Sequence, residues 1–253
     1  MVFKHYLIRI CKEPIGLVCL ILLPVAIASL FSFINNANIE DYRHIVNGHN
    51  MSATLQTMMN MVMFQFFCAG VVVDFMYTDL RSDMRWRLLA SPQPLRKFIF
   101  ANIYASIIFS IISGLIILAV GMIVFNVYLG TIWVTLTTLV VLAVSLTLFG
   151  TLLFLLIPNK RTAEAITFAL AFGQTLPLNF ISFDNTALRF IFERSTPYAF
   201  AFNAIIYSGT AREWFINPVY MDMGRAMMNL GLLVAFGVIV GIAVLIVSRK
   251  RSF

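Results

Sequence analysis

A charged stretch between two apolar segments holds the residue types best suited to binding another protein. Residues 77–97 mix arginines, aspartates and a tryptophan. Three apolar residues recur every four positions on one face of a short helix, and two arginines share another face. These are Leu80, Met84 and Leu88 on the first face, and Arg81 and Arg85 on the second. Such a helix suits docking into a groove on a soluble partner. A solvated loop whose arginines only set membrane topology explains the pattern equally well.

The ends of this short helix have their own sequence markers. Thr78 or Asp79 is able to cap its N-terminus through a side-chain oxygen. Pro92 and Pro94 end it, because a residue that precedes proline is kept out of the helical region. We therefore expect residues 77–97 to form a connecting loop built around one amphipathic helix.

Several polar or aromatic side chains lie in or near the apolar segments and form a second candidate site. Hydrogen bonding between helices is the favoured role for the polar ones. Contact with a transported cargo is the alternative. The residues considered for a cargo pathway are Gln65, Gln174, Pro177, Asn179, Phe200 and Phe202.

No motif for catalysis, nucleotide binding or metal binding is present. The chain lacks GxxxxGK[ST], so it does not bind ATP through a Walker loop, and it lacks HExxH and GxSxG. Its three cysteines have no paired spacing. We therefore predict no catalytic residue, no metal site and no cofactor in this chain.

The composition identifies the class of protein. Of 253 residues, 60% are hydrophobic and 11% are charged, with a mean hydropathy of +0.91. Soluble domains carry about 25% charged residues. These values exclude a soluble enzyme, a disordered chain and a secreted disulfide scaffold, and long apolar runs exclude a transmembrane barrel. The prediction is an all-α polytopic membrane protein with a single domain, residues 1–253.

Six segments are long and apolar enough to cross a membrane, at about 20 residues each. They are Ile15–Ile34, Thr54–Met76, Phe98–Phe125, Ile132–Ile157, Thr162–Phe183 and Ala226–Val247. Rows of small residues that permit close helix contact are Ser106, Ser110 and Gly114 in the third, and Gly237 and Gly241 in the sixth. Six spans place both termini on one side. Most of the 18 Lys and Arg residues then fall on that side, which predicts a multi-pass cell-membrane protein with both termini cytoplasmic.

Two further segments are predicted to lie along the membrane rather than cross it. Residues 1–13 separate apolar from basic side chains on a helical wheel, which favours an interfacial helix on the inner leaflet over an ordinary basic flank. Residues 184–225 are rich in aromatic side chains and have a helix-start pattern at Ser195–Pro197. The apolar part that follows is too short to cross. A re-entrant half-helix and an extracellular aromatic anchor fit it equally well.

With this order of parts, nearly the whole chain resembles the ABC-2 type of ABC-transporter permease. The most specific local match is Asp79 followed by Arg87-Leu88-Leu89-Ala90-Ser91-Pro92, then Leu95–Phe98 leading into a helix. The family pattern there is an acidic residue followed by Leu-Leu-x-x-Pro. Family members usually have a Glu-rich start with a glycine, where this chain has Asp79, Arg81 and Asp83.

The resemblance implies a transmembrane permease subunit of an ATP-driven exporter. It would pair with a second permease, as a homodimer or heterodimer, and couple to cytoplasmic ATPase subunits that bind ATP and Mg²⁺. Its cargo would be amphiphilic: a drug, lipid, lipid-linked glycan or peptide. Membrane lipids are expected partners and nucleic acid is not. The coupling residues implied are Asp79, Arg81, Asp83, Arg85, Trp86, Arg87 and Leu88, with a smaller contact through Arg161 and Glu164.

Two other function classes stay open. A stand-alone secondary transporter or channel would show buried charges or broken helices at mid-membrane. A non-transporting sensor or immunity subunit could share the fold.

Overall fold

The computed structural model describes residues 6, 8–9, 22–23, 25–27, 30, 45–46, 49–81, 86, 90, 95–180, 190, 194–210 and 222–250. Over these residues the chain is almost entirely helical. The strands seen among them are β1 (Ile45–Val46) and β2 (His49–Asn50), which pair antiparallel in a short hairpin. The expected all-α architecture is confirmed, and the first expected span, Ile15–Ile34, lies mostly outside the described residues.

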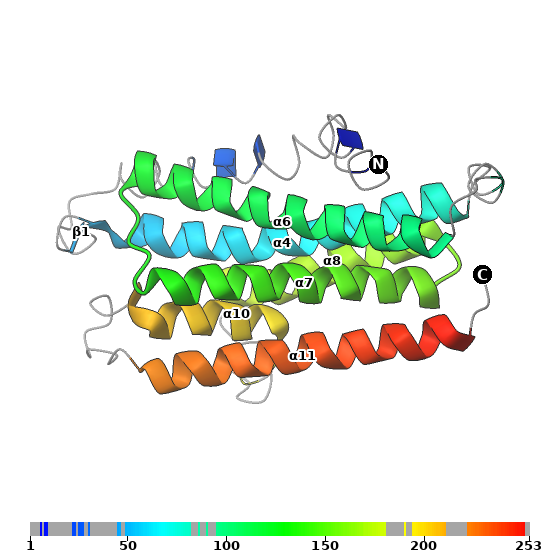
Figure 1. Cartoon of the computed structure of the whole chain (residues 1–253). Helices are drawn as coiled ribbons and strands as arrows, with labels where there is room; N and C mark the ends of the chain where they lie inside the picture. The colour runs from blue at the N-terminus through cyan, green and yellow to red at the C-terminus, as the bar shows by residue number, and fades with distance from the viewer. Residues whose placement is uncertain are drawn as a thin grey trace.

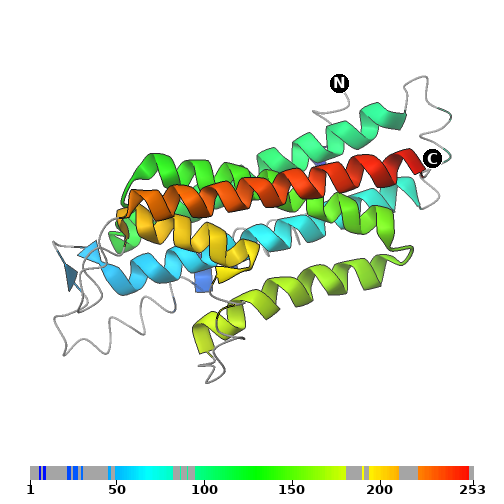
Figure 2. The ribbon, with the colours of Figure 1, turned by 90° about the horizontal axis from the view of Figure 1, so that it is seen from below.

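Long helices lying side by side make up the bundle (Figure 1). They are α4 (Met51–Leu80), α6 (Leu95–Phe125), α7 (Ile132–Leu156), α8 (Lys160–Phe180) and α11 (Met223–Lys250). The centre is formed by α4 and α7: α4 packs against α6, α7 and α8, and α7 also packs against α11. Figure 2 shows α8 along one side of α4, away from α11.

Four of these helices are long and apolar enough to cross a membrane. They are Thr54–Leu80 within α4, Lys97–Phe125 within α6, Ile132–Leu156 and Met223–Lys250. Each has 25 to 29 residues, or roughly 37–44 Å at about 1.5 Å per residue, against a hydrocarbon core of about 30 Å. Helix α8 begins with Lys160, Arg161 and Glu164, which lower its hydropathy. The described helices therefore indicate a membrane protein and show four candidate spans of the six expected.

The C-terminal end of α4 differs from the sequence prediction. The helix was expected to end at Met76 and instead continues to Leu80. Thr78 and Asp79 therefore lie in its last turn, so the prediction that one of them caps a new helix is wrong. The physical reason is tertiary: the side chains of Tyr77 and Arg81 both bind backbone carbonyls at the end of α7, which holds this turn in helical form.

Small residues let the central helices approach closely. A Cβ built on Gly150 of α7 would lie 2.6 Å from the backbone oxygen of Ala69 in α4. A Cβ on Gly114 of α6 would collide with Leu139, and one on Gly237 of α11 would collide with Ser145. Without a strong hydrophobic drive between helices in lipid, such close steric fit provides much of the packing energy. The rows of small residues noted in the sequence thus coincide with helix contacts.

A half-length helix completes one end of the bundle. It is α10 (Pro197–Ile205), which continues as the π-helical turn η3 (Ile206–Thr210). The Thr196 hydroxyl accepts from Ala199 N at 3.1 Å, which confirms the helix start expected at Ser195–Pro197. In Figure 1, α10 lies only along the part of the bundle nearest β1. There the backbone N–H and the hydroxyl of Thr131 both donate to the carbonyl of Ser208.

Candidate functional site

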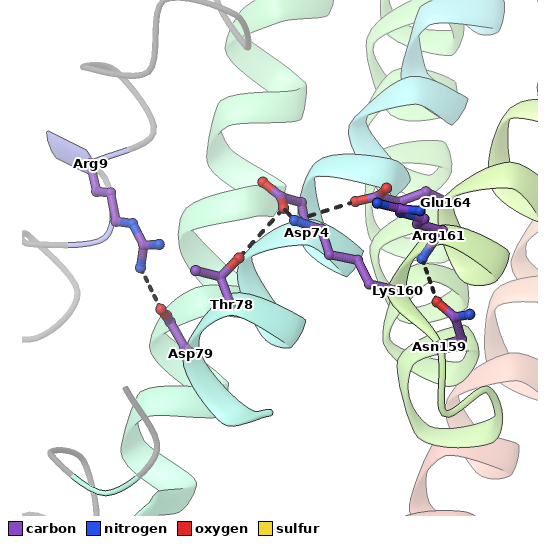
Figure 3. A network of polar contacts seen from close by, with 8 residues as sticks. All are labelled: Arg9, Asp74, Thr78, Asp79, Asn159, Lys160, Arg161 and Glu164. Carbon is purple, nitrogen blue, oxygen red and sulfur yellow. Dashed lines mark hydrogen bonds and ion pairs between the residues drawn. The ribbon is translucent and has the colours of Figure 1, made fainter. Parts of the chain in front are cut away.

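The corner between α7 and α8 positions a group of charged side chains. After α7, Asn159 caps the start of α8: its Oδ1 accepts from Arg161 N at 3.0 Å, and its carbonyl accepts from Ala163 N. The cap fixes the first turn of α8, which carries Lys160, Arg161 and Glu164. Figure 3 shows this turn facing the last turns of α4.

Lys160 joins this turn of α8 to α4. Its ammonium forms an ion pair with Asp74 and lies 3.7 Å from Glu164 Oε1. The Thr78 hydroxyl donates to the same Asp74 carboxylate at 3.5 Å. The hydrogen bond to Asp74 raises the pKa of Lys160, so the ammonium stays charged at neutral pH. The charged groups of Lys160, Asp74 and Glu164 are all partly exposed to solvent. Ion pairs of this kind contribute little to the free energy of folding. Here they set how the first turn of α8 faces α4.

Arg81 joins the end of α4 to the end of α7. Its guanidinium donates to the carbonyls of Phe154 at 2.8 Å and Ile157 at 2.6 Å. It also lies over the rings of Tyr77, at 4.8 Å, and Phe154, at 4.7 Å. The Tyr77 hydroxyl donates to Ile157 as well. The last carbonyls of a helix have no partner within it, and here the Arg81 guanidinium and the Tyr77 hydroxyl satisfy those of Phe154 and Ile157.

We call the following set the junction: Asp74 and Tyr77 of α4 and Arg81 directly after it, Phe154 of α7 and Ile157 directly after it, and Lys160 and Glu164 of α8. It joins three helices at the end of the bundle from which residues 81–94 run from α4 to α6. The junction therefore joins α4, α7 and α8 at this end of the bundle.

The structure divides the residues predicted to couple to an ATPase. Asp79 is buried and paired with Arg9, and Arg81 is occupied by α7, so both make contacts within the chain. Trp86 is 74% exposed, and Arg161 is exposed too. Glu164 is half-buried beside Lys160. The remaining predicted residues, Asp83, Arg85, Arg87 and Leu88, lie outside the described residues.

Sequence reasoning did not find the partners that complete the junction. Lys160 and Asp74 are far apart in the sequence, and nothing in their spacing indicates a pair. The spacing of Tyr77 and Arg81 is more informative, since residues four apart share a helix face. The spacing shows that Tyr77 and Arg81 lie on the same face of the helix. It does not show that this face meets the carbonyls at the end of α7.

The predicted cargo-pathway residues fall into two places. Gln65 is fully buried between α4 and α6, where its Nε2 donates to Ser110 O at 2.8 Å and its Oε1 accepts from the Ser110 hydroxyl. Gln174 accepts from Tyr198 N at 3.3 Å, close to the start of α10. Phe202 is buried with its ring stacked on Tyr198, and Phe200 is half-buried on the same helix. Pro177 and Asn179 lie in α8, with side chains outside the described part.

Gln65 therefore serves packing between α4 and α6, and this role is testable. Gln65→Leu is expected to lower the free energy of unfolding by about 0.5–2 kcal/mol, the range for hydrogen bonds between membrane helices. Ser110→Ala should cost less, because the bond from Gln65 Nε2 to the Ser110 backbone carbonyl survives it. The double variant should cost less than the two losses added together, because both substitutions remove the bond from the Ser110 hydroxyl to Gln65 Oε1. Thermal unfolding in detergent measures all three. Strictly additive losses would contradict the contact.

Within the described residues, no three His, Cys, Asp or Glu side chains gather to hold a metal ion. The ionisable groups of the junction are used in ion pairs and hydrogen bonds, most of them between helices and one, Lys160 with Glu164, within α8. Their arrangement can transmit displacement from one helix to another.

No family model matches the chain, and no curated protein matches it.

Proposed function

We propose that this chain is the transmembrane permease subunit of an ATP-driven exporter of the ABC-2 type, which works with a separate cytoplasmic ATPase. In this proposal it has six spans and both termini in the cytoplasm. The cargo is amphiphilic and moves outward. The four long apolar helices support a membrane role, and the order of parts in the sequence supports the family.

One observation carries the proposal: the 81–94 connection begins at the junction. A permease without a nucleotide motif must receive work through a surface exposed to the cytoplasm. Arg81 binds the end of α7 at 2.6 and 2.8 Å, and Lys160 binds α4 at Asp74. A force applied to the connection would thus reach three helices at once. Trp86, 74% exposed within this connection, is suited to anchor the ATPase.

A second candidate, a stand-alone secondary transporter, is favoured by α10. This helix is nine residues long, and its start lies beside Gln174. Gln174 is 14 residues, or roughly 21 Å, from the first residue of α8, Lys160. Half-helices that begin inside the bundle are typical of secondary transporters. Those proteins also carry charged groups at mid-membrane. In the described parts of α4, α6, α7, α8 and α11, the charged side chains lie toward the helix ends, which favours the ATP-driven exporter.

The exposed tryptophans provide a matched test. Trp86 and Trp133 are 74% and 76% exposed and lie at opposite ends of the bundle. Tagged chains purified from their native membrane in mild detergent are assayed for vanadate-sensitive ATP hydrolysis. Trp86→Ala is expected to reduce the hydrolysis that co-purifies at least about tenfold, as loss of an interface anchor does. Trp133→Ala should leave it unchanged.

Other outcomes would reject the proposal. A well-folded wild-type chain that purifies without ATP hydrolysis contradicts a coupled ATPase. Equal loss with Trp86→Ala and Trp133→Ala contradicts docking at the 81–94 connection. Cargo movement by the isolated chain under an ion gradient would establish the secondary transporter instead.

A further inference from the structure

The last turn of α4 carries a buried acid on the side opposite the contacts with α8. Asp79 is only 3% exposed, and a carboxylate so far from water needs a cation or hydrogen-bond donors. Arg9 provides the cation, with Nη1 2.5 Å from Asp79 Oδ1 (Figure 3). The two residues are 70 positions apart in the sequence. The pair therefore connects the part of the chain around Tyr6 and Arg9, which we call the N-terminal segment, to α4.

Neighbouring contacts hold Arg9 in place. Its guanidinium carbon lies 4.7 Å from the centre of the Phe75 ring, a cation–π arrangement. Tyr6 is 4% exposed, and burial, together with the Asp79 carboxylate, raises the pKa of its phenol. At neutral pH Tyr6 is thus protonated and able to donate to that carboxylate. Tyr6 and Arg9, three positions apart, meet α4 on one face.

This arrangement differs from the wheel drawn from the sequence. There Arg9 belonged to the basic, water-facing side of an interfacial helix. In the structure it is 29% exposed and turned toward Asp79. The burial of Asp79 also removes it from the surface that a soluble partner could touch. The burial of Arg9 and that of Asp79 have the same cause, because the two side chains form an ion pair with each other.

We propose that Arg9 and Asp79 are positioning residues that hold the N-terminal segment against the last turn of α4, directly before the 81–94 connection. The consequence for coupling rests on the proposed function. An ATPase that displaces this connection must move the N-terminal segment with α4 or separate Arg9 from Asp79. The N-terminal segment then takes part in coupling through its contact with α4, in addition to any role as a membrane anchor.

Hydrogen–deuterium exchange of the purified chain tests the contact without any ATPase. The substitutions are Arg9→Asp, Asp79→Arg and the two combined, which exchange the charges. Each single reversal is expected to speed amide exchange in residues 5–12 about tenfold, because like charges then face each other. The combined exchange of charges should return it to near the wild-type rate. Asp79→Asn, which keeps the size and removes the charge, should speed it as well and covers the event that Asp79→Arg does not fold.

Arg225 supplies the matched control. It pairs with Asp222 at 2.9 Å, but the Arg225 side chain is exposed and that of Asp222 is partly exposed, and the pair lies at the start of α11. Arg225→Asp should leave exchange in residues 5–12 unchanged. Wild-type exchange in both Arg9→Asp and Asp79→Asn would overturn the proposal. The proposal would also be overturned if Arg9→Asp and Arg225→Asp changed amide exchange in residues 5–12 by the same factor.

Coupled ATP hydrolysis, measured on the same variants, separates the two proposals. Faster exchange together with reduced hydrolysis, both restored by the combined variant, supports the positioning role. Faster exchange with unchanged hydrolysis overturns the coupling consequence. If the wild-type chain shows no coupled hydrolysis while exchange responds as expected, the exporter proposal fails and the contact stands.

Discussion

Gly150→Ala is expected to lower the free energy of unfolding by about 2–4 kcal/mol, although alanine is the better helix former by about 1 kcal/mol. The added Cβ would lie 2.6 Å from the backbone oxygen of Ala69 and 3.3 Å from its carbonyl carbon. Backbone atoms cannot rotate away as the end of a flexible side chain can. Helices α4 and α7 would have to separate at the centre of the bundle, where both bury most of their apolar side chains.

Gly173 is the matched control for this substitution. A Cβ there meets nothing within 4 Å, so Gly173→Ala should be neutral or stabilising by up to about 1 kcal/mol. Thermal unfolding of both variants in detergent, followed by circular dichroism at 222 nm, measures the difference. If Gly150→Ala were as stable as Gly173→Ala, the two central helices would not approach as closely as the structure has them.

Arg81→Ala is expected to cost about 2–5 kcal/mol of unfolding free energy. The substitution removes two charge-assisted hydrogen bonds, to the carbonyls of Phe154 and Ile157, and the contacts over the rings of Tyr77 and Phe154. The Phe154 carbonyl would lose its Arg81 donor, while the Ile157 carbonyl would keep the hydrogen bond from the Tyr77 hydroxyl. Arg81→Lys should recover only part of the loss, because an ammonium cannot span two carbonyls as a planar guanidinium does.

Arg161→Ala is the control, since it removes one positive charge at the same end of the bundle from an exposed side chain. Its effect should stay within about 0.5 kcal/mol. Thermal unfolding compares the two, and coupled ATP hydrolysis is measured alongside. An Arg81→Ala protein as stable as the wild type would contradict the role of Arg81 in joining α4 to α7. If that stable protein also lacked coupled hydrolysis, a direct contact of Arg81 with the partner, as the family resemblance implies, would replace that role.

The limits of α7 and the start of α10 could be predicted from the sequence, unlike the end of α4. The apolar run starting at Ile132 gave the limits of α7 to within a residue, because the run ends directly before Pro158, which cannot continue a helix. The pattern Ser195–Pro197 located the start of α10, since a hydroxyl before proline satisfies the first free N–H groups. Both cases depend only on residues near one another in the chain.

The amino-acid sequence by itself determined that the chain forms long apolar helices with a basic, arginine-rich connection between two of them. Tertiary structure decided which groups meet: Asp79 with Arg9, Asp74 with Lys160, and Arg81 with the end of α7. The reason is physical. Apolar length makes a helix suitable for lipid wherever it lies, whereas its neighbours are chosen by steric fit at small residues such as Gly150, and only that fit brings distant charges within reach of one another.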